Sequence, residues 1–234
     1  MEQIAARIEA VRTRIDAATG AAGRPVGSVQ LLPVTKTRPA AEVRAAVAAG
    51  CHRFGENKAQ EARAKAAELA GIPGLEWVMI GHLQSNKAKL VADFATEFQG
   101  LDSLPLAAEL DRRLLAAGRQ LDVLIQVNSS GEDSKFGLPP AEVSAFAATL
   151  TPFDALRVRG LMTLALPSPD AAQVAACFER MRDVQRHLRD AVVRGQSYEE
   201  LSMGMSGDFE LAIANGATVV RLGTAIFGQR PPQP

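Results

Sequence analysis

The chain has 234 residues, a length that accommodates one α/β barrel or two smaller domains. Nearly half of the residues are apolar, and glycine and proline are scattered along the chain, which excludes a disordered or fibrous protein. Acidic and basic residues balance to zero formal charge without a separate basic run, so we expect a small-molecule ligand, with no nucleic acid or membrane as partner.

The first segment, about residues 1–20, is expected to form an amphipathic helix. Its apolar residues recur at helical spacing and are Ile4, Ile8, Val11 and Ile15. Gly20 follows as a C-cap. Because the segment lacks an unbroken apolar stretch, we expect neither a signal peptide nor a membrane span, and we expect a cytoplasmic protein.

The rest of the chain alternates between short apolar runs and helical patterns. Eight runs are expected as strands: Val29–Thr35, Cys51–Phe54, Leu75–Ile80, Thr96–Leu101, Asp122–Val127, Leu156–Met162, Glu200–Met203 and Thr218–Leu222. The clearest helical pattern is Ala171–Val193. Such a chain can close as a (βα)₈ barrel or open as a doubly wound sheet.

The positions of the polar residues favour the barrel. Five of them lie at or just beyond the C-terminal ends of expected strands: Lys36, Asn57, Asn128, Ser206 and Arg221. A barrel gathers these ends around one pocket. No linker divides the chain, and residues 230–234 resemble a frayed tail. We therefore predict an α/β fold over residues 1–234, a single-domain (βα)₈ TIM barrel with an extra N-terminal helix.

Lys36 follows the apolar run Leu31–Thr35 at the mouth of the first expected strand. A lone lysine in this position is most often the first exposed residue after a strand. At the rim of a packed barrel it is partly desolvated, which lowers the pKa of the amine and prepares it to attack a carbonyl group. The carbonyl could belong to an aldehyde cofactor or to a sugar.

Two glycine-containing segments, Met203–Asp208 and Arg221–Gly228, follow or overlap the last two expected strands. Glycine lets a ligand approach the backbone, and successive amides can face an anion. Barrels frequently bind phosphate with the loops after strands seven and eight. Asp208 is expected as the N-cap of a helix there. Each segment alone is typical of ordinary turns, but beside Lys36 the pair indicates a phosphate site.

Five segments, in this order, resemble the motifs of the pyridoxal phosphate homeostasis protein family: Leu32–Lys36, Phe54–Glu61, Ile80–Lys87, Leu201–Ser206 and the segment that begins at Arg221. The resemblance spans nearly the whole chain and implies a barrel like the N-terminal domain of alanine racemase. Thr35 stands where the family often has serine, and Trp77–Met79 also departs from the family pattern.

The resemblance implies that pyridoxal 5'-phosphate (PLP) is the cofactor and that Lys36 holds it as a Schiff base. It also implies that Ser206, Gly223 and Thr224 bind the phosphate. Arg221 is then expected to face the pyridine nitrogen, and Asn57 to lie beside the ring.

Other residues that could carry chemistry are given structural roles. Cys51 and Cys177, in an expected strand and helix, have no partner at metal-ligand spacing, so we expect two buried free thiols and no metal site. A structural or surface role is favoured for His82 over that of a general base. Lys135 lies in a polar loop, residues 128–137, that could act as a lid, and a second PLP site there stays open.

The function implied by the resemblance is that of a carrier or buffer in intracellular PLP homeostasis, which passes PLP to apoenzymes. In such a site Arg221 would keep the pyridine nitrogen unprotonated, which weakens the ring as an electron sink. Racemisation needs two acid–base groups, and Lys36 supplies one. In alanine racemases, which this site resembles, the second group is a tyrosine. The only tyrosine of this chain, Tyr198, precedes the seventh expected strand and is therefore expected at the wrong end of the barrel.

We therefore expect a non-catalytic monomer. A weak amino-acid racemase, using Lys36 with water or His82 opposite, stays open as an alternative. So does an aldolase in which Lys36 binds a sugar phosphate, because a neutral lysine beside a phosphate site fits that chemistry too.

Overall fold

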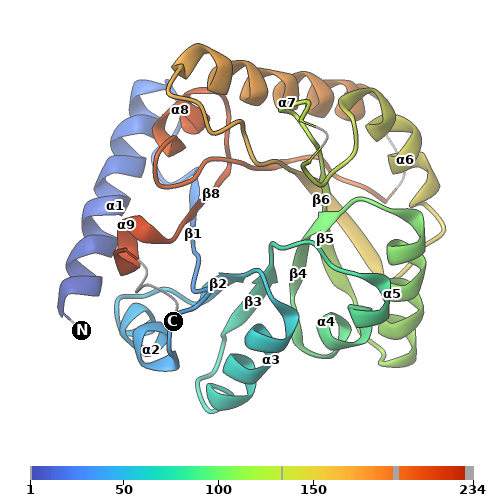
Figure 1. The fold of residues 1–234 in the computed structure, drawn as a ribbon, viewed down its shortest axis with the longest axis horizontal. Coiled ribbons are helices and arrows are strands. Elements are labelled where there is room, and N and C mark those ends of the chain that lie inside the picture. The colour runs from blue at the N-terminus through green and yellow to red at the C-terminus, as the bar shows by residue number, and fades with distance from the viewer. Residues whose placement is uncertain (1, 133, 192–194, 230–234) are drawn as a thin grey trace.

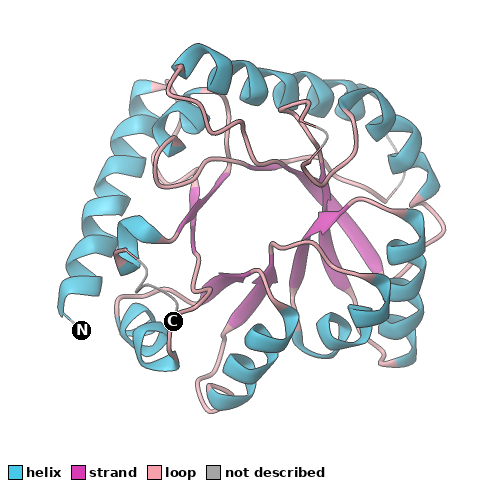
Figure 2. Ribbon diagram, viewed as in Figure 1, coloured by secondary structure: helices cyan, strands magenta, loops and turns pink. Residues whose placement is uncertain are grey.

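A computed structural model describes residues 2–132, 134–191 and 195–229. Eight parallel strands form a ring surrounded by helices (Figures 1 and 2). The strands follow one another around the ring in the order β1-β8-β7-β6-β5-β4-β3-β2. A parallel bridge between Val34 and Gly55 closes the ring, and the Thr35 amide donates to the Gly55 carbonyl over 3.0 Å. The predicted (βα)₈ barrel is therefore confirmed.

The strands are β1 Gln30–Pro33, β2 Arg53–Glu56, β3 Glu76–Met79, β4 Glu97–Leu101, β5 Leu121–Gln126, β6 Leu156–Met162, β7 Glu200–Ser202 and β8 Val219–Leu222. The α-helices are α1 Glu2–Ala21, α2 Ala40–Ala48, α3 Ala59–Glu68, α4 Ala88–Phe94, α5 Leu104–Ala116, α6 Val143–Thr149, α7 Ala171–Ala191, α8 Phe209–Ala214 and α9 Thr224–Phe227. Two 3₁₀ turns, η1 Ser85–Lys87 and η2 Pro140–Glu142, precede α4 and α6.

The expected strand at Cys51–Phe54 begins later than predicted. Helix α2 ends in a turn in which the Gly50 amide donates to Val47 and the Cys51 amide donates to Ala46. This is the Schellman arrangement, and Gly50 has the positive φ, 78°, that it requires. Because the helix end uses the Cys51 amide, Cys51 lies before β2, and the prediction that it belongs to a strand is wrong.

Cys177 lies in α7 as expected, and both cysteines are buried and free. The expected end of this helix at Val193 falls outside the described residues, as does the tail expected at residues 230–234.

Helix α1 is additional to the helices that connect the strands. It packs against α2, α8 and α9 at the edge of the ring (Figure 1). Its apolar stripe buries Ile8, Val11 and Ile15. No helix among the described residues is both long and apolar enough to cross a membrane.

The strands bury two apolar clusters on their two faces. The larger one lies between the strands and the helices, and the smaller one joins Leu32, Val78 and Val219, which come from three different strands. Because side chains alternate along a strand, Arg221 shares the inward face of β8 with Val219. Gln99 and Ser202 are buried polar residues of β4 and β7. The barrel interior is therefore partly polar.

Candidate functional site

A cavity of about 430 Å³ opens at the C-terminal ends of the strands. Its wall includes all six predicted cofactor-binding residues: Lys36, Asn57, Ser206, Arg221, Gly223 and Thr224. The other lining residues are Val34, Ile80, Gly81, His82, Gln126, Phe136, Leu164, Met205 and Gly207. The volume lies within the usual range of small-molecule sites, and this end of a barrel is the usual place for one.

Lys36 is half-buried in this wall, and its neighbours on both sides are fixed by hydrogen bonds. The Thr35 hydroxyl donates to Oε1 of the buried Glu56 over 2.6 Å. Thr37 adopts a positive φ of 65°, and its amide donates to Oε1 of Glu61 over 2.5 Å. A non-glycine residue with positive φ must be held in place by its surroundings. The backbone around Lys36 is therefore constrained.

The two carboxylates share a second lysine, Lys65, from α3. Its Nζ lies 2.6 Å from Oε1 of Glu56, 2.7 Å from Oε1 of Glu61 and 2.6 Å from the Thr35 carbonyl oxygen. Burial raises the pKa of Glu56, while its hydrogen bonds with Lys65 and Thr35 lower it. Lys65 thus ties α3 to the end of β1, directly beside Lys36.

Arg221 approaches the floor of the cavity from inside the barrel and is 3% exposed. Its Nη1 donates to the Ser202 hydroxyl over 2.8 Å, and its Nη2 donates to the Thr163 carbonyl over 2.6 Å. Burial lowers the pKa of Arg221 to about 10, although Asp208 opposes this shift. The guanidinium therefore stays charged at neutral pH and acts only as a donor.

The segments after β7 and β8 meet at the cavity, beyond the strands that carry Ser202 and Arg221. The Ala225 amide donates to the Ser206 hydroxyl over 3.2 Å, so the two loops are joined beside Gly223 and Thr224. Gly204 turns the chain out of β7 with a φ of 93°, and a Cβ there would lie 2.6 Å from that of Ala212. A side chain at this turn would push α8 away.

Asp208 occupies the N-cap position of α8, as predicted, but makes no capping bond to the helix. Its Oδ1 instead accepts the Met205 amide over 2.5 Å. The carboxylate therefore fastens the loop that carries Ser206, and its predicted capping interaction is corrected.

A loop from residues 128 to 137 contributes an aromatic wall. Phe136 is 56% exposed and stacks on His82, with ring centroids 3.9 Å apart and an angle of 8° between the planes. His82 Nδ1 lies 3.8 Å from Oδ2 of Asp102, whose pKa is raised by burial and lowered by His82. Lys135 Nζ donates to the Ala165 carbonyl over 3.1 Å, which ties this loop to the segment after β6.

Asn128 does not join the cavity. Its Nδ2 donates to the Glu132 carbonyl over 2.8 Å within the same loop, and its Oδ1 accepts from Ser130 and Gly131. Of the five residues that the sequence places at strand ends, the structure brings together Lys36, Asn57, Ser206 and Arg221.

Comparison with known proteins identifies the chain. The family model of the alanine racemase N-terminal domain matches residues 6–231. A protein of Pseudomonas aeruginosa named pyridoxal phosphate homeostasis protein is 44% identical over 230 residues, which is 98% of this chain and 97% of that protein. The protein of the same name from Escherichia coli is 42% identical over 98% of both chains. This chain belongs to the pyridoxal phosphate homeostasis protein family.

Solved structures agree with this family and with the fold. PipY of Synechococcus elongatus, with PLP bound, is 38% identical with a TM-score of 0.85, and the alignment covers 97% of this chain and 100% of PipY. Alanine racemase from Streptomyces coelicolor is 21% identical with a TM-score of 0.73, over 95% of this chain and 59% of the racemase. The latter likeness concerns the barrel fold alone.

Several lining residues were not identified from the sequence. Gln126 ends β5 and is 4% exposed, and a polar residue at the end of the apolar strand Leu121–Gln126 is a signal that could have indicated it. Phe136 is an aromatic residue in a polar loop, and this contrast is a second signal that could have indicated a lining residue. His82, for which a structural or surface role is favoured, lies in the cavity wall. Leu164 and Met205 carry no comparable signal, because apolar residues in loops are common.

Tyr198 lies outside this cavity. It precedes β7 at the N-terminal end of the barrel, is buried, and donates its hydroxyl hydrogen to Gln196. Burial raises the pKa of Tyr198 to about 12. Among the described residues, no group of three or more His, Cys, Asp or Glu is placed to hold a metal ion.

Proposed function

We propose that this protein binds PLP as a Schiff base on Lys36 and acts in intracellular PLP homeostasis as a carrier or buffer. The observation that carries the proposal is the convergence of Lys36, Arg221 and the joined Ser206 and Gly223 loops on one cavity. The names of the bacterial relatives and the PLP bound to PipY support it. The whole of residues 1–234 would serve as one domain for this function.

The polar groups of the cavity fit the three functional parts of PLP. The Lys36 amine can condense with the aldehyde, forming one C=N bond and releasing one water, with no oxidant or reductant. The Ser206 hydroxyl, Gly223 and Thr224 would hold the phosphate, because a joined loop with small residues permits close approach. Arg221 would donate to the pyridine nitrogen. Asn57 would lie beside the ring.

An additional acceptor also points to a polar ligand. Gln126 lines the cavity, its Nε2 donates to the Phe136 carbonyl over 3.2 Å, and its buried Oε1 has no hydrogen-bond partner. An unsatisfied buried amide oxygen costs about 1–3 kcal/mol, so a ligand that carries a donor would recover this cost.

The same geometry supports binding without strong catalysis. A charged guanidinium, acting only as a donor, favours an unprotonated pyridine nitrogen, and this weakens bound PLP as an electron sink. Proton transfer on both faces of a substrate carbon needs a second acid–base group opposite Lys36. The only tyrosine, Tyr198, lies at the other end of the barrel.

The visible absorption spectrum tests the PLP site. Purified protein with added PLP is expected to show a yellow Schiff-base band, and Lys36→Ala is expected to lose the band or to retain only a minor fraction of it. Lys58→Ala removes an exposed lysine at the start of α3 and serves as the matched control, with an unchanged band. Equal bands in native protein and Lys36→Ala would contradict the role of Lys36, and no band in any variant would contradict PLP binding.

A weak racemase is a second candidate because His82 lies in the cavity wall, beside Asp102. The homeostasis proposal predicts that an added amino acid keeps its α-proton when incubated with the PLP-loaded protein in deuterated solvent. The measurement is proton NMR of the amino acid. Exchange that disappears in both Lys36→Ala and His82→Ala would establish the racemase instead.

The proposal extends to the setting in which the protein acts. It would work as a cytoplasmic monomer and pass PLP to apoenzymes. Lys135, whose Nζ donates to the Ala165 carbonyl, would not need to bind the cofactor itself.

A further inference from the structure

A line of hydrogen-bonded polar side chains crosses the barrel interior beneath the cavity. Arg221 Nη1 donates to the Ser202 hydroxyl over 2.8 Å, and this hydroxyl donates to Oε1 of Gln99 over 2.6 Å. The Gln99 Nε2 donates to Oε1 of Glu97 over 2.6 Å. Oε2 of Glu97 accepts from Nη2 of Arg53. The line therefore passes through four strands, β8, β7, β4 and β2, from one mouth of the barrel to the other.

The two central members are completely buried. Gln99 and Ser202 are both 0% exposed, and neither has a buried polar atom without a partner. The interior of a (βα)₈ barrel is usually filled by branched apolar side chains. A buried amide or hydroxyl is costly unless all its hydrogen bonds are made. Each side-chain N and O atom of this pair nevertheless has a hydrogen-bond partner, which favours a specific role over simple filling.

The charges of Arg221 and Glu97 fix the direction of the three bonds that join them. Arg221 can only donate, so the Ser202 hydroxyl must accept from it and pass its own hydrogen to Gln99. Ionised Glu97 can only accept, so the Gln99 amide must turn its NH₂ group toward Glu97 and its oxygen toward Ser202. All donors then point from the cation at the cavity to the anion at the far mouth. Bonds aligned in this way polarise and strengthen one another.

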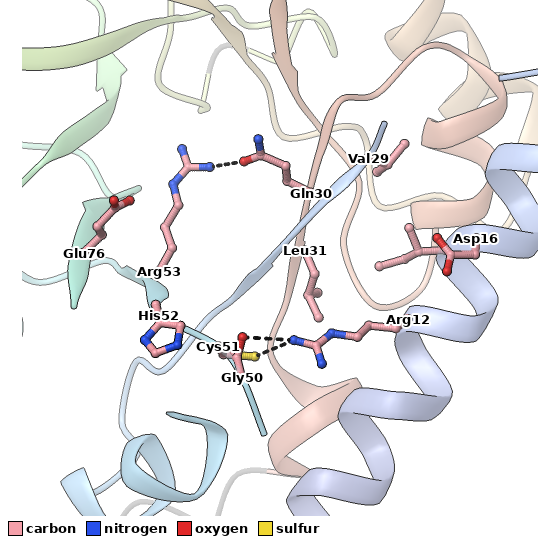
Figure 3. A pocket seen from close by; sticks show the side chains of 11 residues that line it. Arg12, Asp16, Val29, Gln30, Leu31, Gly50, Cys51, His52, Arg53 and Glu76 are labelled. Carbon is pink, nitrogen blue, oxygen red and sulfur yellow. Dashed lines mark hydrogen bonds between the residues drawn. The ribbon is translucent and has the colours of Figure 1, made fainter. Parts of the chain in front are cut away.

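The hydrogen-bond partners of Arg221 are neutral groups, although the charge of Asp208 acts on the guanidinium. Among the described residues its side-chain partners are a hydroxyl and a backbone carbonyl, and no carboxylate is hydrogen-bonded to it. Glu97 is held in turn at the N-terminal mouth, where Arg53 also donates to Oε1 of Gln30 over 2.6 Å (Figure 3). The carboxylate of Glu97 is therefore both anchored and connected to Arg221.

We propose that Gln99 and Ser202 are positioning residues, which hold the Arg221 guanidinium toward the pyridine nitrogen of PLP, with Glu97 as the anchor of the line at the far mouth. The inference rests on the proposed PLP function. Removing Ser202 would leave Arg221 attached through the Thr163 carbonyl and able to rotate, and removing Gln99 would leave the Ser202 hydroxyl without the acceptor that fixes its direction. The pyridine nitrogen would then lose a fixed donor, and a proton from solvent could take its place.

The experiment compares Ser202→Ala and Gln99→Leu with Thr19→Val. Thr19 is equally buried, at 0% exposed, and its hydroxyl donates to the Ile15 carbonyl over 2.7 Å within α1, outside the barrel interior. We expect Ser202→Ala and Gln99→Leu to shift the visible band of the PLP-loaded protein and to release PLP roughly tenfold faster, the effect of losing one hydrogen bond to a charged group. Thr19→Val should do neither.

A second measurement needs no PLP. Nitrogen-15 NMR of the cofactor-free protein should show slowly exchanging Arg221 guanidinium protons, assigned by their loss in Arg221→Lys. These signals should disappear in Ser202→Ala and Gln99→Leu and persist in Thr19→Val. The double variant should behave like either single variant, because both break the same line.

The outcomes separate this inference from the PLP proposal. If Ser202→Ala is folded and keeps both the native band and the Arg221 signals, the positioning role is wrong. If the native protein and all variants lack a PLP band, the PLP proposal fails. If the Arg221 guanidinium signals are then still lost in Ser202→Ala and Gln99→Leu, the orientation of Arg221 by this line stands. Ser202→Ala removes a single oxygen, so it keeps the test decisive even if Gln99→Leu does not fold.

Discussion

Lys65→Met is expected to lower the free energy of unfolding by about 3–5 kcal/mol, the usual cost of removing one partner from a buried ion pair. Lys65 is 7% exposed and Glu56 is 0% exposed, so the carboxylate would remain in the interior without its cation. Methionine replaces most of the aliphatic stem, and the loss therefore reports mainly on the charge. Urea unfolding at neutral pH provides the measurement.

The pH dependence of this loss identifies its cause. Burial already raises the pKa of Glu56, and Lys65 lowers it, so the pKa must rise further in Lys65→Met. A carboxyl group whose pKa is raised by folding favours the folded state below its unfolded pKa, and this contribution disappears as the pH rises through the folded pKa. The deficit of Lys65→Met should therefore be smaller near pH 5 than near pH 8.

Two further variants complete this prediction. Lys65→Met with Glu56→Gln should recover much of the lost stability, because the amide oxygen can still accept from Thr35 without a buried charge. Lys58→Met places the same substitution on an exposed lysine and should change stability by no more than about 0.5 kcal/mol. A deficit that is equal at both pH values and unaffected by Glu56→Gln would mean that lost packing, not charge, is responsible.

The sequence was sufficient to predict where the barrel presents Lys36 and Arg221, because strand ends follow from apolar runs bounded by turn residues. It placed β6 at its observed bounds, since apolar residues alternate with Arg157 and Arg159 at the start of Leu156–Met162, a pattern typical of a strand. It misplaced the start of β2, because the Schellman turn at Gly50 uses a backbone amide that a pattern of side chains does not reveal.

The sequence did not allow us to predict which distant polar residues pair inside the barrel. Gln99 lies outside the family-like segments, and nothing in Leu201–Ser206 indicates that Ser202 meets a residue 103 positions away inside the barrel. The same is true of Lys65, because a lysine in a helix is typical of an exposed position. Its burial follows from the approach of α3 to the end of β1, which depends on the closed ring.

Gly81→Ala is expected to damage both stability and PLP binding, because this residue has no room for a side chain. A Cβ there would lie 2.2 Å from the Asn57 carbonyl oxygen and 2.8 Å from its Cα. These are backbone atoms of the segment after β2, so the contact cannot be relieved by turning a side chain. Overpacking of this kind costs about 1–3 kcal/mol, occasionally more.

Moving the Asn57 backbone away from residue 81 would also change the shape of the cavity, since Gly81 and Asn57 both line it. Separating the ends of β2 and β3 would move Asn57 toward the place proposed for the PLP ring. Gly207→Ala is the matched control, because Gly207 lines the same cavity and a Cβ there would meet no atom within 4 Å. Thermal unfolding and PLP titration should show a lower Tm and weaker binding for Gly81→Ala, with Gly207→Ala close to the native protein.

Thermal unfolding and PLP titration together show whether the close contact between Gly81 and Asn57 serves stability, PLP binding or both. If Gly81→Ala lowers the Tm but binds PLP as tightly as the native protein, the contact between β2 and β3 serves the barrel alone, and Asn57 does not lie beside the ring. Weaker binding that persists at a temperature where the variant is fully folded would instead mean that the spacing of these two strand ends sets the shape of the cavity. The close packing of Gly81 on Asn57 would then couple closure of the barrel to recognition of the cofactor.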